Sequence, residues 1–229
     1  GEQIAVVSSG SPGSSYLQNP TGNGPMVNVR GVVFPTALER DLVSKYGKFS
    51  SEDTSTAWNN RAVDILLGEV LPGDFAYSVL WLCDPDKTQH QAGLGSPEAL
   101  QAIRENDERL GRIMEEAIPK GINLLVGSDH GFSTLGEPVD LNQSLEEAGF
   151  DVGKLVMVSG GMFLRERDPE LVEQLAVFLQ EEGWIGPLFS RGTGEKGDIP
   201  GTISMDAVMI SHPRRSPHLA YSRAWSDEE

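Results

Sequence analysis

Short apolar runs alternate with helix-like segments along this chain, and this alternation constrains its fold more than any other feature. The runs occupy Ile4–Ser8, Val27–Phe34, Phe75–Cys83, Ile122–Gly127, Leu155–Ser159 and Ser204–Ile210. Strands that alternate with helices pair mainly in parallel, because each helix carries the chain back across the sheet. The sequence therefore predicts an α/β fold with a mostly parallel sheet flanked by helices. The run at 75–83 has few polar breaks, so we expect it to lie centrally in that sheet.

The clearest helix begins at Ser96, with Pro97 and Glu98 in its first turn, and continues to about Ala117. Its apolar residues recur at helical spacing and are expected to face inward, with Asp107 on the same face as a hydrogen-bonded structural acid. These apolar residues are Leu100, Ile103, Leu110, Ile113, Met114 and Ala117. Capping patterns predict further helices over 51–70, 141–149 and 168–182, and residues 192–201 are expected to form an exposed loop.

No internal repeat and no long Pro- or Ser-rich linker divides the chain. We expect residues 1–149 to form part of an α/β core, residues 150–201 a sub-domain or cap over the sheet edge, and residues 202–229 a return to the core. The first residue is Gly1 rather than Met, and Glu229 ends a charged stretch. These ends indicate an incomplete domain taken from a longer protein.

The charge excludes some partners and favours others. The chain has 34 acidic and 18 basic residues and a formal net charge of -16, which argues against nucleic-acid duplexes and anionic membrane surfaces and is compatible with bound cations. No apolar run is long enough for a membrane span. The single cysteine, Cys83, leaves the compartment open.

Two short segments place a carboxylate and an imidazole directly after a predicted strand. Asp86 and His90 follow the run at 75–83, and Asp129 and His130 follow the run at 122–127. The carboxyl edge of an α/β sheet is where such folds place their sites, and these side chains are good ligands for divalent metals. Taken singly, Asp84 or Asp86 could instead cap a turn, and His130 could be a hydrogen-bonded, partly buried histidine.

Together the two segments resemble the type I phosphodiesterase/nucleotide pyrophosphatase family of the alkaline phosphatase superfamily. The resemblance covers about residues 75–135, through Pro85-Asp86-x-x-x-His90, then Asp107-x-x-Leu110-Gly111, then Ser128-Asp129-His130-Gly131. It implies an alkaline-phosphatase-like fold and two divalent metal ions, usually zinc with manganese as an alternative. It also implies that Asp86 and His90 bind one ion, and Asp129 and His130 the other.

The resemblance implies a hydrolase of phosphodiesters or nucleotide pyrophosphates that works through a Thr or Ser phospho-enzyme. The family's nucleophile segment and its last metal-binding histidine have no counterpart here, so the catalytic nucleophile is expected to lie outside the chain. A chain without them should be inactive by itself. A monoesterase, sulfatase, phosphonate hydrolase or mutase of the same superfamily, or a non-catalytic metal- or ligand-binding domain, stays open.

Four other features are expected to be structural. Thr56 and Asn59 superficially resemble a nucleophile with its downstream Asn but sit inside a predicted helix. The Ser- and Gly-rich stretch 8–15 lacks the lysine of a P-loop and is interpreted as a turn. His212 and His218 are assigned to a loop or the surface. Arg214 and Arg215 could meet an anion, but solvated charge is the simpler interpretation.

Overall fold

The computed structural model describes residues 3–135, 137–158 and 160–226. The chain forms two compact units, Gly1–Gly131 and Phe132–Glu229, each with its own core. Strands of residues 202–226 pair with strands of the second unit. The predicted organisation into a core at 1–149, a sub-domain at 150–201 and a return to the core at 202–229 stays a prediction.

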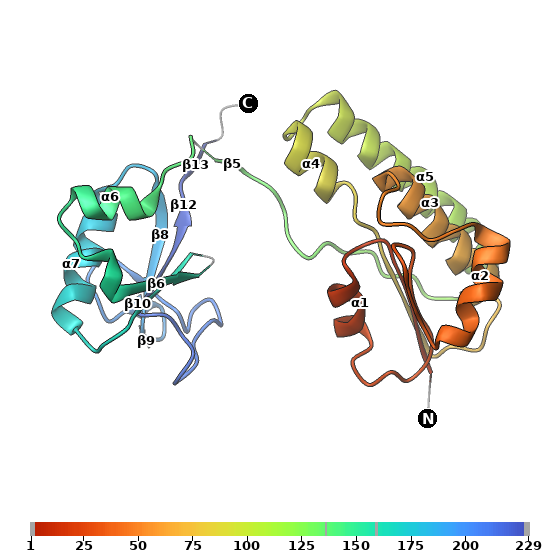
Figure 1. Cartoon of the computed structure of the whole chain (residues 1–229), viewed down its shortest axis with the longest axis horizontal. Coiled ribbons are helices and arrows are strands. Elements are labelled where there is room, and N and C mark those ends of the chain that lie inside the picture. Colours follow the sequence, from red (N-terminus) through yellow and green to blue (C-terminus); the bar gives the residue numbers. More distant parts are fainter. Residues whose placement is uncertain (1–2, 136, 159, 227–229) are drawn as a thin grey trace. The chain divides into compact units, whose positions relative to one another are not determined.

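The first unit is a four-stranded sheet with helices on both faces (Figure 1). Its strands are β1 (Ile4–Ser8), β2 (Met26–Asn28), β3 (Val32–Phe34) and β4 (Tyr77–Trp81). Its helices are α1 (Pro12–Gln18), α2 (Glu39–Tyr46), α3 (Ser55–Ile65), α4 (Asp86–Ala92) and α5 (Pro97–Ala117), with short helical turns η1 (Thr36–Leu38), η2 (Leu66–Val70) and η3 (Ile118–Lys120).

The order of this sheet is β3-β2-β1-β4, and β1 runs parallel to both β2 and β4. The predicted run at 27–34 is divided into β2 and β3, which pair antiparallel. Strand β1 is central, and its residues Ala5, Val6 and Val7 are buried. Because β1, β2 and β4 are parallel neighbours, the segments that follow them meet at one edge of the sheet.

Two predictions about this sheet are wrong. β4 lies at an edge of the four-stranded sheet rather than in its centre, and Tyr77 is 60% exposed. The run Ile122–Gly127 is not a strand, and Leu125 and Val126 are largely exposed. An apolar run has the propensity for a strand but forms one only where a neighbouring strand satisfies its backbone; no strand of the described residues pairs with this run.

Helix α5 begins as predicted but turns a different face inward. Ser96 caps it by accepting a hydrogen bond from the Ala99 amide. The large side chains of Leu100, Ile103 and Met114 are more than 40% exposed, and Asp107 is exposed as well. The buried face carries mainly small residues and one arginine: Ala99, Ala102, Arg109, Ile113 and Ala117. The small side chains let α5 approach α3, and Arg109 bonds to that helix.

The second unit is built on a mainly antiparallel sheet, β6-β7-β12-β8-β11-β10-β9, with a separate β5-β13 pair. Its helical segments are α6 (Leu141–Glu147), η4 (Val152–Lys154) and α7 (Pro169–Glu181). Its strands are β5 (Thr134–Leu135), β6 (Leu155–Val158), β7 (Gly161–Leu164), β8 (Ile185–Ser190), β9 (Gly192–Thr193), β10 (Lys196–Gly197), β11 (Ile203–Ser204), β12 (Leu219–Arg223) and β13 (Trp225–Ser226).

The helices of this unit follow the predictions over 141–149 and 168–182, and Asp140 and Asp168 cap them. The predicted strand at 155–159 is β6; its last residue, Ser159, lies outside the described residues. The predicted strand at 204–210 is short, because β11 ends at Ser204. The predicted loop at 192–201 contains the small β9-β10 pair. Within the described parts of the chain, no helix is long and apolar enough to cross a membrane.

The two C-terminal histidines differ in their roles. His212 lies in an exposed loop, where its Nδ1 accepts hydrogen bonds from the amides of Arg214 and Arg215. His218 is half-buried, and its Nδ1 accepts a hydrogen bond of 3.0 Å from the Leu164 amide of β7. Burial lowers the pKa of His218, and the positive charge of Arg191 lowers it further. His218 is therefore a structural histidine that joins β7 to β12, not a surface residue.

Candidate functional site

The first part of the candidate site follows β4 and is built on a helix rather than a loop. Asp84, which is 5% exposed, caps α4: its Oδ1 accepts hydrogen bonds of 2.9 Å from both the amide and the hydroxyl of Thr88. Asp84 therefore has the capping role that the sequence left open. Asp86 and His90 are four residues apart on α4 and share one helix face. Asp86 Oδ1 lies 3.5 Å from His90 Nε2.

The second part is the segment Ser128–Gly131, whose internal hydrogen bonds orient the imidazole of His130. The hydroxyl of Ser128 donates to the carbonyl of His130 at 2.6 Å. His130 Nδ1 lies 2.9 Å from the Gly131 carbonyl, and since a carbonyl can only accept, Nδ1 carries the proton. This arrangement leaves the lone pair on Nε2, the atom that would bind a metal in the neutral ring.

The same contacts affect the titration of His130. The hydrogen bond to the Gly131 carbonyl raises the pKa of His130 above its usual value, and the nearby carboxylates of Asp129 and Asp86 raise it further. A proton and a metal ion compete for Nε2, so any metal affinity at this ring would increase with pH.

The imidazoles of both predicted histidine ligands lie close to one oxygen of a predicted carboxylate ligand, Asp86 Oδ1. His130 Nε2 lies 3.5 Å from this oxygen, the same distance as His90 Nε2. The remaining carboxylate, Asp129 Oδ2, is 3.8 Å from His130 Nε2. Although the Asp86 side chain is half-exposed, its Oδ1 is buried and accepts no hydrogen bond from any described residue.

The donor set and its spacing fit a zinc ion only in part. Ligands bound at tetrahedral zinc lie about 3.3 Å apart, given bonds of about 2.0 Å, and each imidazole meets Asp86 Oδ1 at nearly that separation. Across residues 3–135, 137–158 and 160–226, however, no three His, Cys, Asp or Glu side chains are arranged as a metal site would need. The geometry places His130 as close to Asp86 as His90 is, so it does not separate the ligands into the two pairs that the resemblance implies.

A buried amide supports the segment that follows β4 and was not identified from the sequence as a supporting residue. Asn59 of α3 is fully buried, and its Oδ1 accepts hydrogen bonds from the Ser9 hydroxyl at 2.6 Å and the Cys83 amide at 3.2 Å. Its Nδ2 donates to Asn106 Oδ1 at 3.3 Å, and Asn106 donates in turn to the carbonyl of Asp84. Asn59 therefore joins the ends of β1 and β4 to α5, next to the start of α4.

Thr56, on the preceding turn of α3, has an exposed hydroxyl that donates to Glu105 Oε2 at 2.9 Å. The structural interpretation of Thr56 and Asn59 thus agrees with their contacts. The interpretation of residues 8–15 as a turn also agrees, since Ser11 caps the short helix α1.

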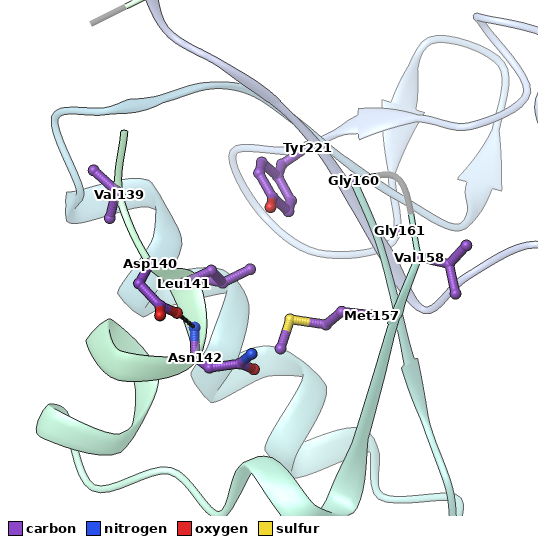
Figure 2. A pocket seen from close by; sticks show the side chains of 9 residues that line it. All are labelled: Val139, Asp140, Leu141, Asn142, Met157, Val158, Gly160, Gly161 and Tyr221. Carbon is purple, nitrogen blue, oxygen red and sulfur yellow. Dashed lines mark hydrogen bonds between the residues drawn. The ribbon is translucent and has the colours of Figure 1, made fainter. Parts of the chain in front are cut away.

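None of the four candidate ligands lines either of two cavities in the described chain. One, of about 460 Å³ in the first unit, is lined by residues of α3, α4, α5 and their flanks, including Asp84, Thr88, Glu98 and Glu105. The other, of about 260 Å³ in the second unit, has a mixed lining in which Leu141 and Met157 lie beside Asp140, Asn142 and Tyr221 (Figure 2). The carboxylate of Asp140 already accepts hydrogen bonds from two amides of α6, so it acts there as a cap.

Comparison with known proteins identifies the family of the chain. The family model for type I phosphodiesterase / nucleotide pyrophosphatase matches residues 12–180. Human ectonucleotide pyrophosphatase/phosphodiesterase family member 7 is 26% identical over 120 residues, which is 51% of this chain. The chain spans 24% of the length of that relative. No solved structure matches the chain.

The two mixed sheets flanked by helices are consistent with an alkaline-phosphatase-like α/β fold. Because the family model covers more than half of the sequence, the chain belongs to the type I phosphodiesterase/nucleotide pyrophosphatase family.

Proposed function

We propose that this chain is part of a metal-dependent hydrolase of phosphodiesters or nucleotide pyrophosphates. The observation that carries the proposal is the buried, unbonded Oδ1 of Asp86, which faces Nε2 of both His90 and His130 at 3.5 Å. Carboxylate oxygens and imidazole nitrogens are ligand types that divalent cations bind in proteins, although the described side chains do not by themselves form a complete three-ligand site. Asp86, His90, Asp129 and His130 are the proposed protein ligands of two ions, zinc or manganese.

The chemistry of such a centre explains why these residue types are needed. Two bound divalent ions would lower the pKa of an attacking Thr or Ser hydroxyl and neutralise the leaving oxygen at phosphorus. In this chain, α4 holds Asp86 and His90 on one face, and the hydrogen bond to the Gly131 carbonyl places the proton of the neutral His130 ring on Nδ1. The carboxylates of Asp86 and Asp129 add negative charge that favours cation binding.

We further propose that the nucleophile and the remaining ligands belong to a longer protein. Four candidate ligands are too few for two complete metal sites, and the chain spans only 24% of its human relative. The reading frames on both sides of the coding segment test this point. A metal-binding Asp with a downstream Thr or Ser before the chain, and a His-Gly motif after it, would support the proposal.

Zinc binding by the chain itself tests the ligand assignment. We expect titration calorimetry at neutral pH to detect zinc binding that is weakened about tenfold or more by Asp86→Asn or His130→Gln, since each substitution removes a donor. His212→Gln, which changes an exposed histidine of the second unit, should bind zinc like the unsubstituted chain. Equal zinc affinity in all four proteins would contradict the assignment.

Turnover by the chain tests whether the centre is complete. We expect no measurable hydrolysis of a chromogenic phosphodiester, with or without added zinc, because no nucleophile with the family's pattern is present in the sequence. Strong zinc-dependent hydrolysis that His130→Ala abolishes would show that the chain carries a complete catalytic centre, and the proposal of an outside nucleophile would then fail.

A further inference from the structure

Two basic residues lie at the same sheet edge as the candidate metal ligands. Arg30 follows β2 by two residues, and Lys87 is the second residue of α4, directly after Asp86. Strands β2 and β4 both run parallel to β1, which lies between them, so their carboxyl ends share one edge. The topology therefore brings together two cations that are 57 residues apart in the sequence.

Both cations lie over one buried aromatic ring. The guanidinium carbon of Arg30 lies 4.5 Å from the ring centroid of Trp58, and Lys87 Nζ lies 4.3 Å from it. Trp58 is 2% exposed, and its Nε1 donates a hydrogen bond of 2.7 Å to the Ser50 carbonyl. The indole is therefore a fixed platform that holds the two charges near each other.

The charges of Arg30 and Lys87 are not balanced by carboxylates. Among the residues that the structure describes, no carboxylate oxygen comes within 4.0 Å of a charged nitrogen of either side chain, although acidic residues outnumber basic ones 34 to 18. Arg30 Nε is buried and has no hydrogen-bond partner in the described chain. Two like charges on one ring repel each other, and a buried unbonded donor is unfavourable.

We propose that Arg30 and Lys87 bind an anionic phosphate group of the substrate, next to the residues proposed to bind metal. This assignment rests on the proposed function for the identity of the substrate. An anion would relieve the repulsion between the two cations, and a guanidinium can bind two phosphate oxygens at once. Two cations favour a ligand with two adjacent phosphate groups, as in a pyrophosphate ester, over a simple monophosphate.

Inorganic pyrophosphate is the probe that tests this site without metal. We expect calorimetry on the full chain in EDTA at low ionic strength to detect pyrophosphate binding, and Arg30→Gln or Lys87→Gln to weaken it about tenfold, the loss of one charge-assisted contact. Inorganic phosphate should bind more weakly than pyrophosphate. Arg40→Gln is the matched control, because Arg40 is an exposed arginine of α2 paired with Asp41, and it should leave the affinity unchanged.

The charge-conserving variants Arg30→Lys and Lys87→Arg separate a binding role from a purely structural one. Both keep a cation over Trp58 and so should fold even if Arg30→Gln or Lys87→Gln does not. We expect Lys87→Arg to retain pyrophosphate affinity within about threefold, and Arg30→Lys to bind pyrophosphate more weakly than the unsubstituted chain, because lysine cannot bind two oxygens at once, but more tightly than Arg30→Gln. The proposal is overturned if the unsubstituted chain does not bind pyrophosphate, or if Arg40→Gln weakens binding as much as Arg30→Gln. Because EDTA removes metal, a failure of zinc binding would contradict the proposed metal ligands and not this result.

Discussion

Arg109→Met is expected to lower the free energy of unfolding of the first unit by about 3 kcal/mol, the range seen when one partner of a buried ion pair is removed. The Arg109 side chain is 4% exposed and bonds to Glu105 Oε2 at 3.1 Å. It also donates to Asn60 Oδ1 at 2.8 Å and to Asn106 Oδ1 at 2.7 Å. Methionine retains the volume but leaves these acceptors without their charged donor. Urea unfolding followed by circular dichroism measures the change.

Arg112→Met provides a matched control on the same helix. Arg112 also connects α5 to α3, through a bond of 2.7 Å to Asp64, but both side chains of this pair are nearly half exposed. Exposed ion pairs contribute less than about 1 kcal/mol because water and salt screen them. The two substitutions remove the same charge from one helix, so a similar loss of stability in both variants would rule out the buried network around Arg109 as the cause.

Helix ends and the central strand could be predicted from the sequence because their signals are local. Ser96 precedes Pro97 and Glu98, and its hydroxyl does cap α5. Asp168 precedes Pro169 and caps α7 in the same way. Strand β1 has the predicted bounds, since its four apolar residues are followed by small residues and a helix cap. In each case the residues that determine the structure lie within a few positions of one another.

The inward face of α5 could not be predicted, because burial depends on partners that are distant in the sequence. The large apolar side chains of Leu100, Ile103 and Met114 match a buried stripe in spacing, yet they are exposed. Arg109 lies inward instead, because it bonds to Asn60 of α3. This partner is 49 residues away in the sequence, so the spacing of residues within α5 does not reveal it. A hydrophobic pattern shows which side chains are apolar but does not show which face meets another element.

In the candidate site, too, the sequence motifs could be predicted, but the contacts between residues distant in the sequence could not. The order and spacing of Asp86, His90, Asp129 and His130 indicated the family from sequence, and the family match confirms that recognition. The approach of His130 Nε2 to Asp86 Oδ1 joins residues 44 positions apart and required the structure. The paired cations on Trp58 were not predicted either, because only the parallel order of β2, β1 and β4 brings Arg30 and Lys87 to one edge.

Asn59→Asp is expected to destabilise the first unit by about 3 kcal/mol at neutral pH and much less in acid. The new carboxyl would keep the acceptor for the Ser9 hydroxyl and the Cys83 amide, but its second oxygen would replace the Nδ2 donor that now faces Asn106 Oδ1 at 3.3 Å. At this fully buried position, loss of solvation and the opposed acceptor raise the pKa of the new carboxyl above its value in the unfolded chain. As pH rises, the unfolded chain therefore loses this proton at a lower pH than the folded chain does. The folded variant keeps its full free energy of unfolding below the unfolded pKa of about 4, and this free energy falls as pH rises through the folded pKa.

Asn60→Asp, at the adjacent residue, is the control that separates burial from charge. Asn60 is exposed, and its Oδ1 accepts a hydrogen bond of 2.8 Å from Arg109 Nε, so a carboxylate there meets a cation and water. We expect Asn60→Asp to change the stability at neutral pH by less than about 1 kcal/mol. Urea unfolding of both variants from pH 4 to pH 8 gives the comparison. If Asn59→Asp unfolds at the same urea concentration as Asn60→Asp at every pH, Asn59 does not hold the ends of β1 and β4 through its hydrogen bonds.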